Sequence, residues 1–151
     1  NEYPDFGGYY RVLNHGEFLA QLVREGKLTI EREVRERTVY HASCYLGRSN
    51  DIYEAPRKVL EALDAELVEM KRCRSNGLCC GAGGAQMFKE EEKGNTRINI
   101  DRSNEAIDTG ADIIASACPF CNTMMTDGVK LAEKEESVRV MDIAELIAQS
   151  I

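Results

Sequence analysis

The sequence predicts an α/β domain with a mostly parallel sheet, flanking helices, and cysteine groups at the carboxyl ends of strands. Short apolar segments alternate along the chain with segments of helical periodicity, a pattern typical of strand–helix–strand units. Three groups of cysteines each follow an expected strand. Open α/β sheets bind ligands at that edge, so the two patterns together place a candidate site there.

The first half of the domain reads as strand, turn, helix and strand. Residues 38–40 form the first expected strand, and a turn-like stretch follows at 47–51. A helix is expected over 55–64, where Pro56 suits the first turn and the apolar residues share one face. Residues 66–70 alternate apolar and polar side chains like a second strand.

The second half continues the alternation after a loop rich in glycine and cysteine. Gly110 is a good residue to end a helix, and Asp142 is a good N-cap for the closing helix. The expected elements are the loop over 73–84, a helix over 98–109, a strand over 111–117, a helix over 119–134, a strand over 138–141 and a helix over 143–149.

An internal similarity predicts two domains. Residues 10–21 match residues 138–149, with identical Arg, Val, Glu, Ala and Gln at corresponding positions. We therefore interpret residues 1–30 as the tail of a preceding, truncated repeat with its linker, and residues 31–151 as a complete cysteine-rich repeat. Chance likeness of two amphipathic strand–helix units is the alternative. The charge-rich stretch 27–37 suits a linker or an exposed helix.

Composition excludes several classes of function. With 151 residues, of which 43% are hydrophobic and 30% charged, the chain is long enough and apolar enough to bury a core. A net charge of −7 argues against binding to nucleic acid or to an anionic membrane surface. No segment is as long and apolar as a membrane span. Six cysteines are too few for a disulfide scaffold.

Most of the cysteines follow one spaced pattern: a single cysteine, an adjacent pair, and a Cys-x-x-Cys. Adjacent cysteines seldom form a disulfide with each other, because the bridge is strained. The glycines after the pair let the backbone approach, so that amide N–H groups can point at sulfide. Thiolates are soft ligands that select iron–sulfur clusters, zinc or copper(I). The cysteines of this pattern are Cys44, Cys79, Cys80, Cys118 and Cys121.

Four interpretations of the cysteines remain open on the residues alone. A disulfide framework fits poorly, since nothing else suggests secretion. A thioredoxin-type redox pair at Cys118 and Cys121 leaves the other three thiols unexplained. Structural zinc needs four ligands, which any four of the thiols or His41 would supply. An iron–sulfur site uses all five thiols, and we favour it.

Residues around the pattern have weaker assignments. Cys73 lies outside the spacing and is expected to be a small, partly buried side chain. His41, three residues before Cys44, either forms a hydrogen bond near the site that tunes the metal or has a local structural partner. The glycine loop lacks the Gly-Lys-Ser/Thr ending of a phosphate loop, which excludes nucleotide binding there. Four basic residues either offset the negative charge of a cluster or are solvated surface charges: Arg48, Lys71, Arg72 and Arg74.

The motif Cys-x(34)-Cys-Cys-Gly-x(36)-Cys-x-x-Cys resembles the cysteine-rich CCG domain of heterodisulfide-reductase-like iron–sulfur oxidoreductases. The likeness covers residues 34–150, and residues 1–30 resemble the segment after the first Cys-x-x-Cys in two-copy members. Ala42 and Ser43 stand where many members have Asp-Pro, a departure that leaves the thiols in place but affects the local turn and His41. The sequence around the cysteines also resembles the family at residues 41–48, 55–60, 78–84, 97–99 and 109–121.

The resemblance implies an iron–sulfur cluster-binding electron-transfer domain, the C-terminal portion of a larger oxidoreductase that in some members reduces a disulfide. It implies a non-cubane 4Fe-4S cluster; the catalytic residues stay unassigned, and we expect the fragment alone to be inactive. In some members one copy holds zinc, so the alternative is a structural zinc-binding module that docks partner redox subunits. The implied ligands are Cys44, Cys79, Cys80, Cys118 and Cys121.

The same resemblance implies partners and a location. The partners are other redox subunits, either a flavoprotein or a ferredoxin-like protein, with a quinone-linked membrane subunit as a further option. Nucleic acid is not among them. The expected location is the cytoplasm, with membrane association on the cytoplasmic side through the parent protein as the variant.

Overall fold

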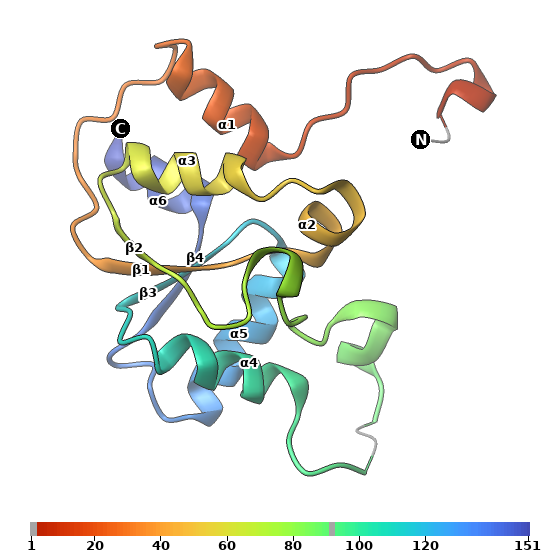
Figure 1. Cartoon of the computed structure of the whole chain (residues 1–151), viewed down its shortest axis with the longest axis vertical. Helices are drawn as coiled ribbons and strands as arrows, with labels where there is room; N and C mark the ends of the chain where they lie inside the picture. The colour runs from red at the N-terminus through yellow and green to blue at the C-terminus, as the bar shows by residue number, and fades with distance from the viewer. Residues whose placement is uncertain (1–2, 91–92) are drawn as a thin grey trace.

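A four-stranded, fully parallel sheet forms the centre of the computed structural model, which describes residues 3–90 and 93–151. Hydrogen-bonded neighbours follow the order β2-β1-β3-β4 (Figure 1). The predicted α/β fold with a mostly parallel sheet is confirmed. The strands are β1 (Arg37–His41), β2 (Glu66–Val68), β3 (Ile113–Ser116) and β4 (Arg139–Asp142).

Helices cover both faces of the sheet (Figure 1). Helices α1, α3 and α6 share one apolar cluster with the strands, while α4 and α5 share the other. The short helix α2 follows β1 at its carboxyl end. The helices are α1 (His15–Arg24), α2 (Cys44–Asn50), α3 (Glu54–Ala62), α4 (Ile98–Ile107), α5 (Pro119–Leu131) and α6 (Ile143–Ser150), with 3-10 turns η1 (Tyr3–Phe6), η2 (Arg74–Asn76) and η3 (Gly83–Phe88).

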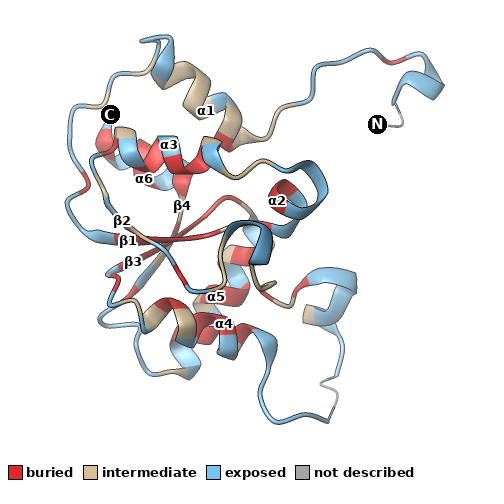
Figure 2. Cartoon of the chain, viewed as in Figure 1, coloured by how far each residue is buried: buried red, intermediate tan, exposed pale blue. Residues whose placement is uncertain are grey.

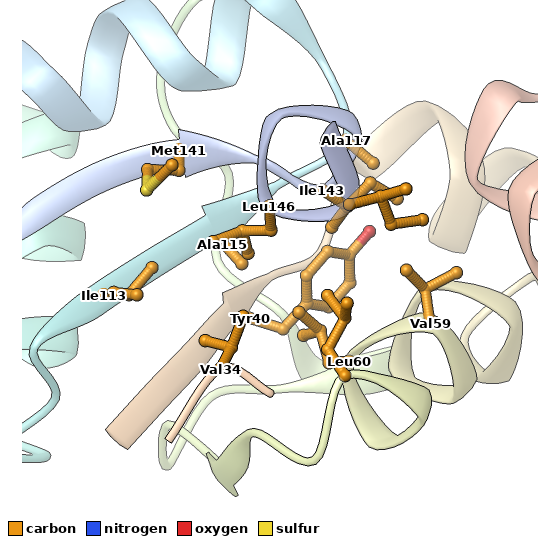
Figure 3. Packing of buried hydrophobic residues seen from close by; sticks show 12 residues of the cluster. Val34, Tyr40, Val59, Leu60, Ile113, Ala115, Ala117, Met141, Ile143 and Leu146 are labelled. Atoms are coloured by element: carbon orange, nitrogen blue, oxygen red, sulfur yellow. The ribbon is translucent and has the colours of Figure 1, made fainter. Parts of the chain in front are cut away.

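The core lies on both sides of the sheet, because neighbouring side chains of a strand point to opposite faces. Tyr40 packs with Leu60 of α3 and Leu146 of α6 (Figure 3). Its neighbour Val39 packs on the other face with Met125 of α5. Figure 2 shows that buried residues follow the strands and the helix faces that meet them. A sheet covered in this way buries its central strands on both sides, and all four residues of β3 are accordingly buried.

The turn expected at residues 47–51 is wrong, because most of this stretch belongs to α2. Glycine, serine and asparagine are weak helix formers, and this composition suggested a turn. Packing overrides the propensity here. Leu46 and Gly47 are buried, and a Cβ atom on Gly47 would come within 2.8 Å of the Tyr53 ring. The helix then ends at Asp51, whose φ of 55° is left-handed.

The other predicted helices and strands are present, with shifted ends. The helices expected over 98–109 and 119–134 end earlier, at Ile107 and Leu131. Gly110 lies beyond the last helical residues rather than capping them, and its φ of 71° turns the chain toward β3. These shifts are a consequence of fraying at helix ends, where hydrogen bonds change to the tighter 3-10 type.

The charge-rich stretch 27–37 contains no helix; residues 27–36 form an irregular connection from α1 to β1, which begins at Arg37. Its backbone is tied to the domain at two points. The Glu31 N–H donates to the Ser150 carbonyl at 2.7 Å, and the Val34 N–H donates to the Leu63 carbonyl at 2.7 Å. Helix α1, which precedes this connection, packs against α3 and α6 (Figure 1).

Helices α1 and α6, which contain the two similar sequences, begin in the same way. Asn14 caps α1, and Glu17 bonds back to its N–H; Asp142 caps α6, and Glu145 bonds back in the same manner. The two helix starts also meet, since His15 Nε2 lies 3.1 Å from Asp142 Oδ1. The sequence similarity thus extends to identical capping boxes in the structure.

Candidate metal centre

The candidate site lies where the chain connections diverge. Strands β1 and β3 are neighbours, but the chain leaves β1 toward α3 on one face and leaves β3 toward α5 on the other. Such a switch point opens a crevice at the carboxyl ends of the two strands. Cys44 begins α2 just after β1, and Cys118 is the N-cap of α5 just after β3.

The structure brings the three cysteine groups of the spaced pattern together at this edge of the sheet. The sulfur atoms of Cys80 and Cys121 lie 3.5 Å apart. Cys79 and Cys118 pack against this buried pair. Burial and then the neighbouring Cys79 and Cys80 thiols raise the pKa of Cys44, so the fifth thiol also lies within range of the others. Groups separated by more than thirty residues in sequence therefore share one location, as the strand-end argument predicted.

Cys73 stands apart from this group, in agreement with its place outside the spacing. Its surroundings include the Glu69 carboxylate, and burial followed by this carboxylate raises the pKa of the Cys73 thiol. Cys73 is half-buried, as expected.

The buried pair is polarised by a hydrogen bond. The hydrogen bond between the two sulfurs lowers the pKa of Cys80 and raises the pKa of Cys121. A backbone N–H also points at sulfur, since Gly81 N lies 3.3 Å from Cys79 Sγ. Gly81 has a φ of +90°, a conformation that favours glycine, and this is the local reason for a glycine after the adjacent pair.

A buried histidine and arginine adjoin the two buried thiols. His41, at the end of β1, is 1% exposed, and one of its ring nitrogens lies within 4.8 Å of the sulfurs of Cys80 and Cys121. Burial lowers the pKa of His41, which favours the neutral ring. The Arg102 Nε atom donates to His41 Nδ1 at 3.0 Å, from a side chain that is itself fully buried.

Sequence reasoning missed Arg102. The sequence contains part of the pattern that indicates its burial, because Arg102 shares one face of α4 with the buried residues Asn99 and Ala106 at helical spacing. A charged residue at such a position is usually solvated, so the pattern alone does not identify it as a buried neighbour of the site.

The basic residues that sequence analysis singled out hold loops instead. Arg48 donates to the Gly77 carbonyl at 2.6 Å, just before the cysteine pair. Arg72 pairs with Asp101 and Glu105 of α4, and Arg74 pairs with Glu54 and Glu69. Carboxylates thus neutralise Arg72 and Arg74, and Lys71 is exposed. Arg102, by contrast, contacts His41, the residue beside the buried thiols.

The donor set fits a thiophilic metal group. Five thiols are more than one tetrahedral zinc ion uses, whereas iron–sulfur clusters are held by several cysteine thiolates. The walls are apolar and polarisable, with Ala82 and Met124 buried against the pair and Met87 partly buried. A dry wall and N–H groups near sulfur are features that tune such clusters. The residues present therefore fit an iron–sulfur cluster.

The five clustered cysteines extend from the core to the surface. Cys80 and Cys121 are 3% and 2% exposed, whereas Cys44 is an exposed residue at the start of α2. The aromatic side chains of Tyr45 and Phe120, each next to a cysteine in sequence, are also largely exposed. One side of the site is thus anchored in the protein and the other is accessible to a partner.

Among the described residues, none of the helices combines the length and the hydropathy that crossing a bilayer requires.

Comparison with known proteins places these features in a family context. The cysteine-rich domain family CCG matches residues 38–126. The chain is 49% identical to the probable iron-sulfur-binding oxidoreductase FadF of Bacillus subtilis, over 100% of this chain and 21% of that protein. It is 44% identical to an EtfAB:quinone oxidoreductase of Syntrophomonas wolfei, over 97% of this chain and 21% of the relative.

A further relative comes from an archaeon. The chain is 36% identical to one subunit of the dihydromethanophenazine:CoB–CoM heterodisulfide reductase of Methanosarcina barkeri, over 94% of this chain and 34% of that protein. The chain therefore spans only a fifth to a third of the length of these relatives.

Proposed function

This chain belongs to the CCG cysteine-rich domain family, as its cysteine spacing predicts, and from that membership we propose that it binds an iron–sulfur cluster and transfers electrons within a larger oxidoreductase. One observation carries the proposal: thiols from three distant chain segments converge at the carboxyl edge of the sheet. The relatives named for iron–sulfur binding and for heterodisulfide reduction support the same function.

The proposed ligands are the five thiols, and their surroundings suit that role. Cys80 and Cys121 anchor the buried side, while Gly81 donates its N–H to Cys79. Cys44 closes the exposed side, where electrons would enter or leave. A bound iron–sulfur cluster would supply one-electron redox chemistry, and by resemblance we propose the non-cubane 4Fe-4S type. The proposed ligand set is Cys44, Cys79, Cys80, Cys118 and Cys121.

The partners follow from the same family. We propose a flavoprotein or ferredoxin-like subunit on one side of the electron path, and a quinone-linked membrane subunit or a disulfide substrate on the other. The similarity to an EtfAB:quinone oxidoreductase supports a quinone-linked partner. The similarity to a heterodisulfide reductase supports a disulfide substrate. The proposed location is the cytoplasm, with membrane association on the cytoplasmic side through the parent protein as the variant.

Anaerobic reconstitution with iron and sulfide tests the proposed function. We expect several irons and sulfides per chain, with the broad visible absorption of thiolate-ligated iron, because the thiols of the spaced pattern lie close together at one edge of the sheet. The competing function is a zinc-stabilised docking module, which the proximity of His41 to Cys80 and Cys121 favours. One zinc per chain, tighter than iron and without colour, would establish that alternative and refute electron transfer by this domain.

We also propose that residues 1–30 are the tail and linker of a preceding repeat, and residues 31–151 the complete one. The segment before α1 matches β4 in sequence, yet it forms no strand in the described structure. Its side chains are exposed, with Tyr9 at 84% and Val12 at 72%. Apolar side chains of this kind usually lie in a sheet, so the segment corresponds to an edge strand whose sheet belongs to the upstream copy.

Hydrogen exchange tests this domain assignment. In a longer chain that includes the upstream repeat, alternate backbone amides within residues 9–13 should exchange at least tenfold more slowly than in this chain, because the ladder of an edge strand protects every second N–H. The amides of α6 provide the control, since they should exchange equally in both. Equal exchange at residues 9–13 would show that the segment is not an edge strand.

A further inference from the structure

We infer that Arg102 is a positioning residue that fixes the tautomer of His41, making His41 a hydrogen-bond donor to the cysteine sulfurs and not a metal ligand. The tautomer itself follows from the protein side chains alone. Its consequence for a bound cluster rests on the proposed function. Two side chains far apart in sequence carry the inference, His41 at the end of β1 and Arg102 on α4.

The first step is the direction of the bond between the two residues. A guanidinium group has only N–H donors and no acceptor. Arg102 Nε lies 3.0 Å from His41 Nδ1, so Nδ1 must be the acceptor and must lack a proton. A neutral imidazole ring then carries its single proton on Nε2. Both side chains are at most 1% exposed, so bulk water does not compete for this bond.

The second step is the rigidity of the arginine. Arg102 Nη1 donates to the Arg72 carbonyl at 2.7 Å and to the Glu105 carboxylate at 2.9 Å. Glu105 is held in turn by the Arg72 backbone N–H at 2.6 Å. These bonds fix the plane of the guanidinium, which keeps the Nε–H directed at His41.

The third step concerns the opposite side of the histidine ring. His41 Nε2 is buried and has no hydrogen-bond partner among the described residues. A ring nitrogen of His41 lies within 4.8 Å of the sulfurs of Cys80 and Cys121, and Nδ1 is already taken by Arg102. With Nδ1 engaged by Arg102, the Nε2–H is the group of His41 that is available to donate to a cysteine sulfur or to a cluster sulfur.

The same tautomer excludes His41 from the ligand set. A protonated Nε2 has no lone pair to offer a metal, and moving the proton to Nδ1 would bring two N–H groups face to face at the arginine. Metal ligation in this crevice is then left to thiolates. An N–H donated to a cluster sulfur stabilises the reduced, more negative state, so it raises the reduction potential.

The tautomer is measured directly on the reduced, metal-free chain. With ¹⁵N-labelled histidine, two-bond proton–nitrogen correlations separate the Nε2–H, Nδ1–H and doubly protonated rings. The chain has two histidines, so the variant His15→Gln assigns the signals. We expect the Nε2–H pattern for His41 at neutral pH. An Nδ1–H or doubly protonated pattern in the unaltered chain overturns the inference, whatever any variant does.

A matched pair of variants isolates the hydrogen bond. In Arg102→Gln the amide nitrogen occupies the chain position of the arginine Nε and still donates, whereas in Arg102→Met a methyl group stands there. Both variants lose the charge, so their difference reports the donor. We expect Arg102→Gln to keep the Nε2–H tautomer and Arg102→Met to shift the ratio about tenfold toward Nδ1–H, which corresponds to one hydrogen bond to His41.

The domain reconstituted with an iron–sulfur cluster provides a second measurement. The reduction potential of the reconstituted cluster should be more negative in Arg102→Met than in Arg102→Gln, as followed by an equilibrium redox titration. Equal potentials and equal tautomer ratios in the two variants would refute the positioning role. If the unaltered chain binds no cluster, the proposed function fails, while the tautomer measurement on the metal-free chain still decides this inference.

Discussion

We expect the replacement of Cys80 with serine to abolish iron and sulfide binding in the reconstituted domain. Cys80 is 3% exposed, and its sulfur lies 3.5 Å from that of Cys121, so it occupies the buried centre of the site. A serine hydroxyl is a hard, weakly acidic donor, which makes it a poor substitute for a thiolate that binds iron. We expect the iron content to fall at least tenfold, to the background of a chain that was never reconstituted.

The matched control is Cys73→Ser, which removes a thiol from the same loop without touching the site. Cys73 lies beside Glu69, so iron and sulfide should remain at the level of the unaltered chain. The two variants together separate a site effect from a general loss of thiols. Retention of the full iron content in Cys80→Ser would contradict the five-thiolate site, and a four-ligand zinc site would leave at least one of the five thiols dispensable for metal.

The meeting of the thiols was predictable from sequence because it depends on topology. Cys44 and Cys118 directly follow strands, and parallel strands end at one edge of a sheet. No side-chain packing needs to be known for that argument. The prediction needed only the alternation of strands and helices, which strong apolar runs such as residues 111–117 make visible.

The features that sequence reasoning missed depend on contacts between elements. The helical state of residues 47–50 follows from the packing of Gly47 on Tyr53, which no local pattern records. The buried state of Arg102 follows from the face of α4 that meets the end of β1. Both cases reverse a local preference through tertiary packing, so they require coordinates rather than periodicity.

The same packing makes Gly128 the position of the largest expected stability loss. Gly128 lies in α5 where that helix crosses α4, and a Cβ atom there would come 2.1 Å from Ser103 Oγ and 2.9 Å from the Asn99 carbonyl oxygen. The serine side chain can rotate away, but the carbonyl belongs to the α4 backbone and cannot. Alanine at this position therefore forces the two helices apart, at a cost of about 3 kcal/mol in the free energy of unfolding.

Urea denaturation of Gly128→Ala measures this loss, and Gly94→Ala is its control. A Cβ atom on Gly94 would meet nothing within 4 Å, so that variant should stay within about 0.5 kcal/mol of the unaltered chain. The crossing also connects stability to the site, because α4 carries Arg102 and α5 carries Cys121. We therefore expect Gly128→Ala to weaken metal binding even where the chain is folded. An unchanged unfolding midpoint would mean that α4 and α5 do not approach as closely as described.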